Sequence, residues 1–227
     1  MKPPRLTPRL QEAAHLVGSA DCLADVGCDH GKLCLYCLMT GIADRAVAID
    51  ISRPSLDKAA CFADEYGVRL TCLHGDGLTP LAADEADCVV IAGMGGMEIG
   101  RILASAAYCP RRLVLVPHHN ADMVLRYISL AGYLVNYDAF LADGKHWYRA
   151  VRAARTATAH PLGADWQRQI EALDPNENWY VGADNAHNPQ FPAYRAQRMA
   201  HLAAIIAEGN RRPEAQAEWH YLDITKV

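Results

Sequence analysis

The first residues that could do chemistry are carboxylates and glycines grouped near the N-terminus. The run reads Asp25-Val26-Gly27-Cys28-Asp29-His30-Gly31. Gly27 and Gly31 allow a tight turn and let the backbone approach a ligand closely. A carboxylate at Asp29 would repel a pyrophosphate but attract a cationic sulfonium or an amino group, so the run differs from the glycine loop of dinucleotide sites. The cofactor contacts that we predict in this run are Asp25, Gly27, Cys28, His30 and Gly31.

Two further acidic positions follow at the ends of later apolar runs. Asp50 lies 25 residues after Asp25, where a carboxylate can accept hydrogen bonds from both ribose hydroxyls of a nucleoside. Asp50 could instead stabilise the start of the helix after Ser52. In the Gly75-Asp76-Gly77 run, Asp76 could accept a hydrogen bond from an adenine amine. We predict that Ile51 and this whole run also line the cofactor site.

A glycine-rich run, Ala92-Gly93-Met94-Gly95-Gly96, ends the fourth apolar segment. It holds more glycine than a turn requires, which leaves room for a flat ring against the backbone. We expect Ala92, Gly93 and Met94 to contact the cofactor, and Gly95 and Gly96 to contact the substrate that enters here.

These runs must be held by alternating strands and helices. Strands are predicted at about residues 22–26, 46–49, 68–73, 88–92 and 113–116, and helices at 6–17, 31–39, 54–66, 97–107 and 121–130. Such alternation predicts a parallel sheet with helices on both faces, and ligands bind at the carboxyl ends of its strands.

The chain then departs from the nicotinamide-binding version of this fold. Residues 133–141 and 146–151 read as extended, and Asp143-Gly144 between them predicts a type I′ hairpin, which joins antiparallel strands. We therefore predict a Rossmann-like, seven-stranded methyltransferase sheet that is parallel with a terminal antiparallel hairpin. Residues 1–156 would form this domain. Residues 157–227 would form a small helical C-terminal region, with one convincing helix over 193–208 that Gly209 ends.

Composition sets broad limits. The 227 residues are 51% hydrophobic and 21% charged, with no run of about 18 apolar residues, and the stretch Met1 to Arg9 has no apolar signal region. We expect a cytoplasmic protein whose eight cysteines are reduced. Residues 99–164 carry eight basic and three acidic groups, so a polyanionic partner would meet them and the basic N-terminal tail. Ordinary solvated surface charge explains the same pattern.

Two other motifs are poor candidates for a functional site. Cys34 and Cys37 have C-x-x-C spacing but fall within a predicted helix, where both are expected to pack. His118-His119 lacks a carboxylate or histidine at ligand spacing. We therefore predict no metal site.

The motifs around Asp25, Asp76 and Met94 together resemble the bacterial tRNA (adenine-22-N1)-methyltransferase family over about residues 5–155. The resemblance implies S-adenosylmethionine as cofactor and tRNA as substrate. This chain departs from the family pattern in three places. The family usually has Pro-Asn where this chain has Pro117-His118, and Tyr-Glu where it has Trp147-Tyr148. The helical C-terminal part of the family is usually longer. The substrate contacts that we predict on this side are Arg9, Pro117, His118, Trp147 and Tyr148.

Adenine N1 is a lone-pair nucleophile that needs no deprotonation, and its methylated ring is cationic. A nearby carboxylate would stabilise that charge or accept a proton from N6, and Asp29 is the catalytic residue that we predict. Tyr148, Trp147 or His118 could stack on the unstacked base. A methyltransferase for a small molecule or a protein would share the cofactor loops, and a non-catalytic RNA-binding module would share the fold. The oligomeric state is not predicted.

Overall fold

The computed structural model describes residues 1–174, 177–207 and 213–225, and a seven-stranded sheet lies at its centre. The strand order is β3-β2-β1-β4-β5-β7-β6. Neighbouring strands from β3 to β5 are parallel, and β7 is antiparallel to both β5 and β6. The strands are β1 (Ala20–Val26), β2 (Ala43–Asp50), β3 (Thr71–His74), β4 (Cys88–Ala92), β5 (Arg112–Val116), β6 (Tyr133–Asp143) and β7 (His146–Arg155). The predicted sheet and its terminal antiparallel hairpin are confirmed.

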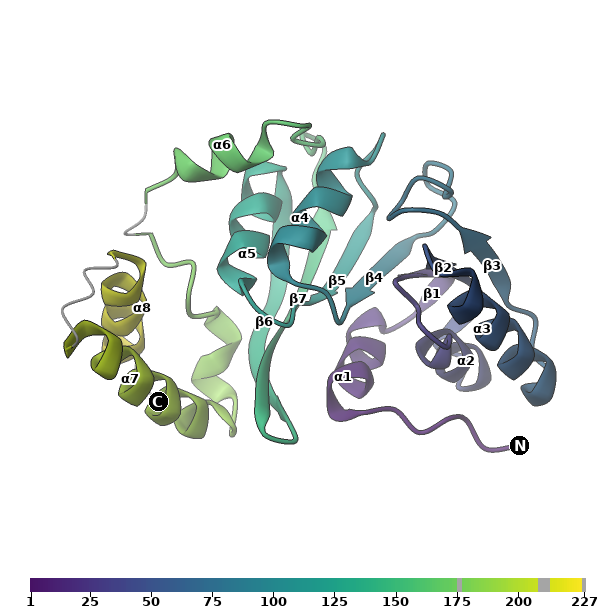
Figure 1. Ribbon diagram of the computed structural model, residues 1–227, viewed down its shortest axis with the longest axis horizontal. Helices are drawn as coiled ribbons and strands as arrows, with labels where there is room; N and C mark the ends of the chain where they lie inside the picture. The colour runs from purple at the N-terminus through teal and green to yellow at the C-terminus, as the bar shows by residue number, and fades with distance from the viewer. Residues whose placement is uncertain (175–176, 208–212, 226–227) are drawn as a thin grey trace.

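Helices cover both faces of this sheet (Figure 1). They are α1 (Pro8–Val17), α2 (Lys32–Met39), α3 (Arg53–Tyr66), α4 (Gly96–Ser105), α5 (Ala121–Leu130), α6 (Trp166–Glu171), α7 (Phe191–Ala207) and α8 (Pro213–Ile224), with a 3-10 turn η1 (Ala183–His187). Helices α1, α2 and α3 share one apolar core with one face of the sheet, and α4, α5 and α6 share another core with the opposite face. Successive side chains along a strand point to opposite faces, so Leu23 lies in the first core and Ala24 in the second.

Local signals in the sequence explain the start and end of α3. The Ser52 side chain accepts a hydrogen bond from the backbone N–H of Ser55, at 3.3 Å, and Pro54 occupies the first turn. Gly67 ends the helix with φ of 68°, a left-handed conformation that glycine adopts without a steric penalty. Asp50 is the last residue of β2 and lies two residues before this cap, at the predicted site.

The hairpin turn differs by one residue from its prediction. Asp143 pairs with His146, so the two residues of the turn are Gly144 and Lys145 and not Asp143 and Gly144. A type I′ turn needs positive φ at both central residues, but Gly144 has φ of 63° and Lys145 is not among the residues with positive φ. The type I′ prediction was therefore wrong. Asp143 belongs to β6, and this places its carboxylate beside the N-terminal helix.

The C-terminal region contains more helix than the sequence pattern indicates. Besides α7, it holds α6 and η1, and α8 packs against α7. The buried residues of α8 are Ala215, Ala217 and Leu222, whose uneven spacing gives no clear apolar stripe, and for this reason the expectation of one helix was wrong. The predicted end of α7 at Gly209 lies outside the described residues. In the part of the chain that the structure describes, no helix is both long and apolar enough to cross a membrane.

Candidate functional site

The predicted cofactor loops meet at the carboxyl ends of β1, β2 and β4. The backbone N–H of Asp29 donates a hydrogen bond to Asp50 Oδ2, at 3.1 Å, and the backbone N–H of Ser52 donates to Asp50 Oδ1, at 2.8 Å. A carboxylate has about four lone-pair positions, so each Asp50 oxygen can still accept a hydrogen bond from a ligand hydroxyl. Asp50 thereby joins the loop after β1 to the loop after β2.

Asp25 is the buried carboxyl of this group. Its residue is 5% exposed, and the Cys34 thiol donates a long hydrogen bond to Asp25 Oδ2, at 3.9 Å. Burial raises the pKa of Asp25 to about 7, and the nearby carboxylates of Asp50 and Asp29 act in the same direction. The site therefore holds one carboxyl that changes its charge close to neutral pH.

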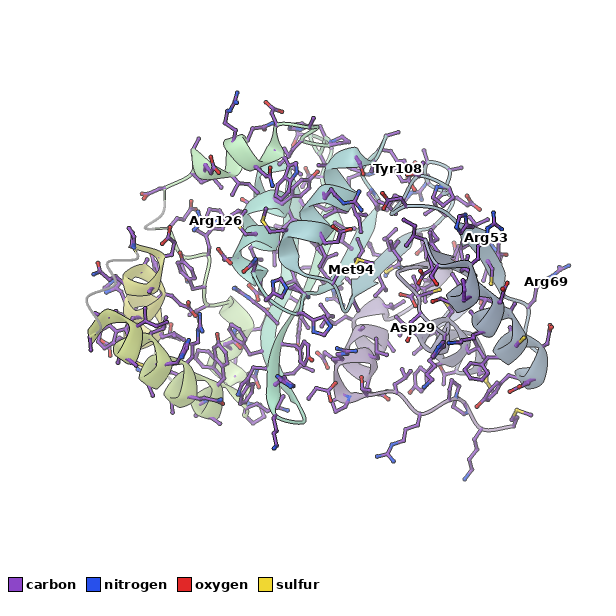
Figure 2. All side chains as sticks on the ribbon, in the orientation of Figure 1. Asp29, Arg53, Arg69, Met94, Tyr108 and Arg126 are labelled. Carbon is purple, nitrogen blue, oxygen red and sulfur yellow. The ribbon has the colours of Figure 1, made fainter. Side chains whose placement is uncertain are left out.

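Asp29 has a very different environment. Its side chain is 76% exposed, and its Oδ1 lies 3.5 Å from His30 Nε2. Its backbone has φ of 51°, an unusual conformation that aspartate tolerates better than most residues. Figure 2 shows Asp29 and Met94 at the same edge of the sheet. The Asp29 carboxylate is thus free to approach a ligand, because no buried partner holds it.

A small pocket of about 130 Å³ lies between these loops. Met94 closes one side of it, since a side chain added at Gly27 would collide with the Met94 methyl group. Ligand pockets usually measure roughly 300–1,000 Å³, so with Met94 in this position the pocket is smaller than the usual site for a ligand as large as a nucleoside. The predicted cofactor residues that line this pocket are Gly27, Asp50, Ile51, Gly75, Asp76, Gly77 and Met94.

The other predicted cofactor residues support these loops from behind or from the side. The backbone N–H of Cys28 donates to the Ile49 carbonyl, at 3.1 Å, which ties the loop after β1 to β2. Gly31 precedes α2 with φ of 67°, and a side chain there would meet Ala59 of α3. His30 is beside Asp29, and Ala92 is the last residue of β4. None of these four is among the residues that line the small pocket.

Asp76 forms an ion pair with Arg101 that was not predicted from the sequence. Arg101 of α4 donates from both Nη atoms to the Asp76 carboxylate, at 2.9 and 2.7 Å, and also binds Glu98. The hydrogen bonds from Arg101 lower the pKa of Asp76. Asp76 is thus engaged by a guanidinium at the position where an adenine amine was predicted. This contact could not be predicted, because Arg101 and Asp76 are 25 residues apart in the chain and lie in different elements.

The glycine-rich loop after β4 is paired with the loop after β5. The N–H of Gly93 donates to the Val116 carbonyl, the N–H of His118 to the Met94 carbonyl and the N–H of Gly96 to the His119 carbonyl, at 2.8–3.1 Å. A side chain at Gly95 would collide with the His119 ring, and one at Gly96 would collide with the Asn120 carbonyl. The space that we assigned to a substrate ring beside Gly95 is therefore occupied by the ring of His119.

Three of the predicted substrate residues, Arg9, His118 and Tyr148, form one cluster beside this loop. Arg9 Nη1 lies 3.2 Å from His118 Nε2 and 3.3 Å from the Tyr148 hydroxyl, and its guanidinium stacks over the Tyr148 ring. Arg9 Nε also lies 4.0 Å from Asp143 Oδ2. Asp143 was not predicted as a site residue, because it was placed in the hairpin turn and not in β6. Burial and then the charge of Arg9 lower the pKa of His118, so the ring is neutral at pH 7.

Trp147 is not part of this cluster. Its indole N–H donates to Gln197 of α7, at 2.7 Å, and its ring meets Tyr194 edge-on, at 5.5 Å between centroids. Trp147 therefore faces the C-terminal helices, whereas Tyr148 faces Arg9. Pro117 directly follows β5 and precedes His118. Cys34 and Cys37 are buried and free within α2. The described residues contain no group of three His, Cys, Asp or Glu side chains able to hold a metal ion.

The strand order and the acidic and glycine-rich loops at the carboxyl ends of its strands define a Rossmann-like methyltransferase fold. Residues 6–151 match the family model described as a methyltransferase domain, and the chain belongs to this family.

Individual relatives agree with this assignment. The tRNA (adenine(22)-N(1))-methyltransferase of Bacillus subtilis is 30% identical over 147 residues, which is 62% of each chain. The structure of Mycoplasma capricolum TrmK in complex with S-adenosyl-homocysteine has a TM-score of 0.76 at 19% identity, covering 97% of this chain and 99% of that one. A putative tRNA (m1A22) methyltransferase of Streptococcus pneumoniae in complex with S-adenosyl-L-methionine also gives 0.76, at 21% identity over 96% and 100%. The chain matches about 62% of the length of its curated relatives.

Proposed function

We propose that this protein transfers a methyl group from S-adenosylmethionine to N1 of an adenosine in tRNA. The observation that carries the proposal is the hydrogen bond from the Asp29 backbone to Asp50, which brings the two acidic loops to one edge of a methyltransferase sheet. The activity printed for the B. subtilis relative supports the choice of acceptor. The reaction is proposed to take place in the cytoplasm, where tRNA is found.

The residues at this edge fit the proposed cofactor chemically. Asp50 retains acceptor positions for ribose hydroxyls, Asp76 can accept from an adenine amine when Arg101 releases it, and the absence of a side chain at Gly27 lets the backbone approach the ligand. Asp25 and Asp29 favour a positively charged group nearby. When bound, S-adenosylmethionine supplies an electrophilic methyl group.

The chain then has to hold the acceptor base and compensate its charge. The adenine ring becomes cationic as N1 forms its new bond, and the exposed carboxylate of Asp29 can approach it because no buried partner restrains it. The neutral His118 and the Tyr148 ring, 5.4 Å apart between centroids, offer a surface on which the base can stack. Positioning of the two reactants contributes much of the acceleration.

The decisive experiment separates acceptor classes. Purified protein, S-adenosylmethionine with a labelled methyl group and unmodified tRNA transcripts are incubated, and the nucleosides are then analysed by mass spectrometry. We expect 1-methyladenosine in tRNA. Label that appears in a protein or a small molecule from an added extract, with none in tRNA, would support the alternative acceptors. Salt-sensitive tRNA binding without transfer would indicate a non-catalytic module.

The role of Asp29 has its own test. Asp29→Asn removes the carboxylate charge and keeps the size of the side chain, so kcat should fall about 100-fold while the Kd for S-adenosyl-homocysteine changes little. Asp44→Asn is the matched control, because Asp44 is exposed near the start of β2, at the opposite end of that strand from Asp50. Turnover equal to that of the control would remove Asp29 from the mechanism.

A further inference from the structure

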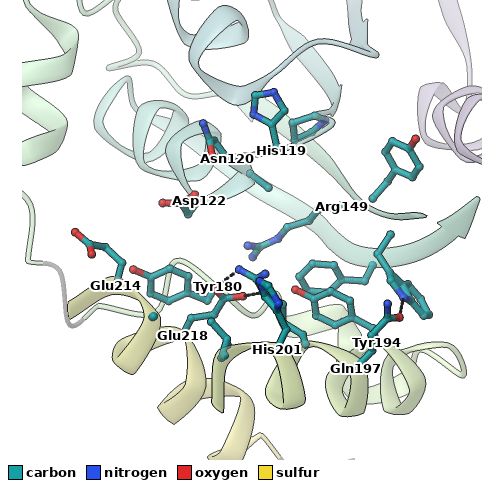
Figure 3. Close-up of a pocket in the computed structure, with 18 of the residues that line it drawn as sticks. His119, Asn120, Asp122, Arg149, Tyr180, Tyr194, Gln197, His201, Glu214 and Glu218 are labelled. Atoms are coloured by element: carbon teal, nitrogen blue, oxygen red, sulfur yellow. Dashed lines mark hydrogen bonds and ion pairs between the residues drawn. The ribbon is translucent and has the colours of Figure 1, made fainter. Parts of the chain in front are cut away.

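A second and much larger cavity lies beside the predicted site. It measures about 700 Å³, is open to solvent, and is lined by the loop after β5, the β6–β7 hairpin and helices α7 and α8 (Figure 3). This volume lies within the usual range for sites that bind small organic groups, about 300–1,000 Å³. The C-terminal helices thus form one wall of a cavity whose other wall belongs to the methyltransferase sheet.

The arginines of this cavity are already neutralised. Arg149 donates from Nε and Nη2 to Asp138, both at 2.6 Å, and from Nη1 to the Trp179 carbonyl, at 2.7 Å. Arg198 donates from Nε and Nη2 to Glu218, at 2.6 and 2.8 Å. Because both guanidinium groups are held by carboxylates, the cavity does not present a free cationic fork to a phosphate.

Hydrogen-bond acceptors remain available in the cavity instead. Asp122 from the start of α5 and Glu214 from α8 lie on facing walls (Figure 3). Glu214 makes no hydrogen bond or ion pair with another described residue. Asp122 Oδ2 lies 3.8 Å from Arg126 Nε, and the Asp122 carboxyl also accepts a hydrogen bond from the backbone of Met123. Burial raises the pKa of Asp122. His201 of α7 adds an imidazole that makes no hydrogen bond with the described residues. Such a lining suits a ligand that donates hydrogen bonds.

Several aromatic rings also line the cavity. The rings of Phe140 and Tyr194 stack with 3.7 Å between centroids, and Trp147 meets Tyr194 edge-on. The indole N–H of Trp147 is satisfied by Gln197, so the ring offers an apolar surface to the cavity. Phe140 and Tyr194 are buried beneath the cavity surface, whereas Trp147 is half-buried, and an aromatic ring of this kind is a surface on which nucleobases stack in single-stranded RNA recognition.

The cavity also continues directly from the proposed transfer site. His118 and His119 line it, and the same two residues are hydrogen-bonded through their backbones to Met94 and Gly96 in the loop after β4. A strand of RNA with one base at the transfer site would therefore reach the cavity with an adjacent nucleotide.

We propose that this cavity receives a second unstacked base of the RNA substrate, adjacent to the methylated one, with its exocyclic amine directed at Asp122 and Glu214. The inference rests on the proposed function. It gives the C-terminal helices a role in selecting the RNA. A carboxylate accepts from a base amine, and the ring stacks on the aromatic wall while its phosphate stays outside among solvent.

The test compares two cavity variants with two matched controls. Glu214→Ala and His201→Ala change the cavity, whereas Asp223→Ala and His220→Ala change exposed residues of α8 that do not line it. We expect each cavity variant to raise the KM for a tRNA transcript roughly tenfold, with the Kd for S-adenosyl-homocysteine unchanged and both controls like wild type.

Transcripts that lack the base at either nucleotide flanking the methylated one complete the test. One of these two transcripts should raise the KM of the wild-type enzyme by a similar factor. The same transcript should not raise the KM of the cavity variants further, because the base and the cavity residues take part in one contact. The inference would be overturned if the cavity variants behaved like the controls, or if the effects of a cavity variant and of the missing base on KM multiplied. Neither result would affect the proposed function, provided that the wild-type enzyme methylates tRNA. A wild-type enzyme that methylates no tRNA would overturn the proposed function and this inference with it.

Discussion

Replacing Asp25 with asparagine should make the stability of the ligand-free protein less dependent on pH. The Asp25 carboxyl is 5% exposed, and burial raises its pKa from 3.8 to about 7. The folded protein therefore binds this proton more tightly than the unfolded chain does, and the free energy of unfolding falls as pH rises through this window. A shift of about three pH units corresponds to about 4 kcal/mol, fully present below pH 3.8 and fully lost above pH 7.

Asp25→Asn removes the titrating group, so the pH-dependent loss should disappear. Urea unfolding at pH 4.5 and pH 8 would measure it: relative to wild type, the variant should gain about 3 kcal/mol between the two pH values. A constant offset from the new amide does not alter this difference. Asp21→Asn, on the exposed part of the same strand, is the control and should follow wild type. A difference between Asp25→Asn and wild type that is equal at both pH values would refute the reasoning, because burial of a charge would then not determine the stability of this site.

Two ion pairs lead to further predictions. Arg101→Met should raise the affinity for S-adenosyl-homocysteine, by up to about fivefold in calorimetric titration, since it frees both oxygens of Asp76 from a solvent-exposed pair; an unchanged or weaker affinity would show that Arg101 does not compete with the ligand. Asp138→Asn should lower the free energy of unfolding by about 3 kcal/mol, because Arg149 is 4% exposed and would lose its bidentate partner; a loss below about 1 kcal/mol would contradict this, and Asp223→Asn is the exposed control.

Strands β1, β4 and β5 could be predicted because they are buried on both faces and read as short apolar runs. Strand β3 is partly exposed, and it begins at Thr71 and not at residue 68 as predicted. Residues 88–92 were predicted as a strand, and β4 has these bounds. The acidic and glycine-rich loops follow directly from the ends of such strands, so their meeting at one edge was also predictable. The Asp29–Asp50 hydrogen bond joins two of these ends.

Contacts between distant segments were not predictable from local patterns. Arg101 reaches Asp76 from the neighbouring helix, and Trp147 turns toward α7, which lies 50 residues later at Gln197. Helix α8 went unnoticed because it packs through small alanines and lacks a regular apolar stripe. In each case the partner comes from the tertiary arrangement, whereas hydrophobic periodicity describes only one element at a time.

The glycines after β4 lie where they were predicted, but the structure gives a different reason for them. Gly95 and Gly96 lack side chains where the His119 ring and the Asn120 carbonyl come closest, so they permit the loops after β4 and β5 to pack together. Between these glycines and the cofactor pocket lies Met94, whose side chain lines the pocket and whose carbonyl accepts a hydrogen bond from His118. Met94 lines the cofactor pocket and His118 lines the larger cavity, so one backbone hydrogen bond joins the two linings. We expect a ligand that shifts the backbone of Met94 to move His118 as well, which would link the acceptor side to occupancy of the cofactor side.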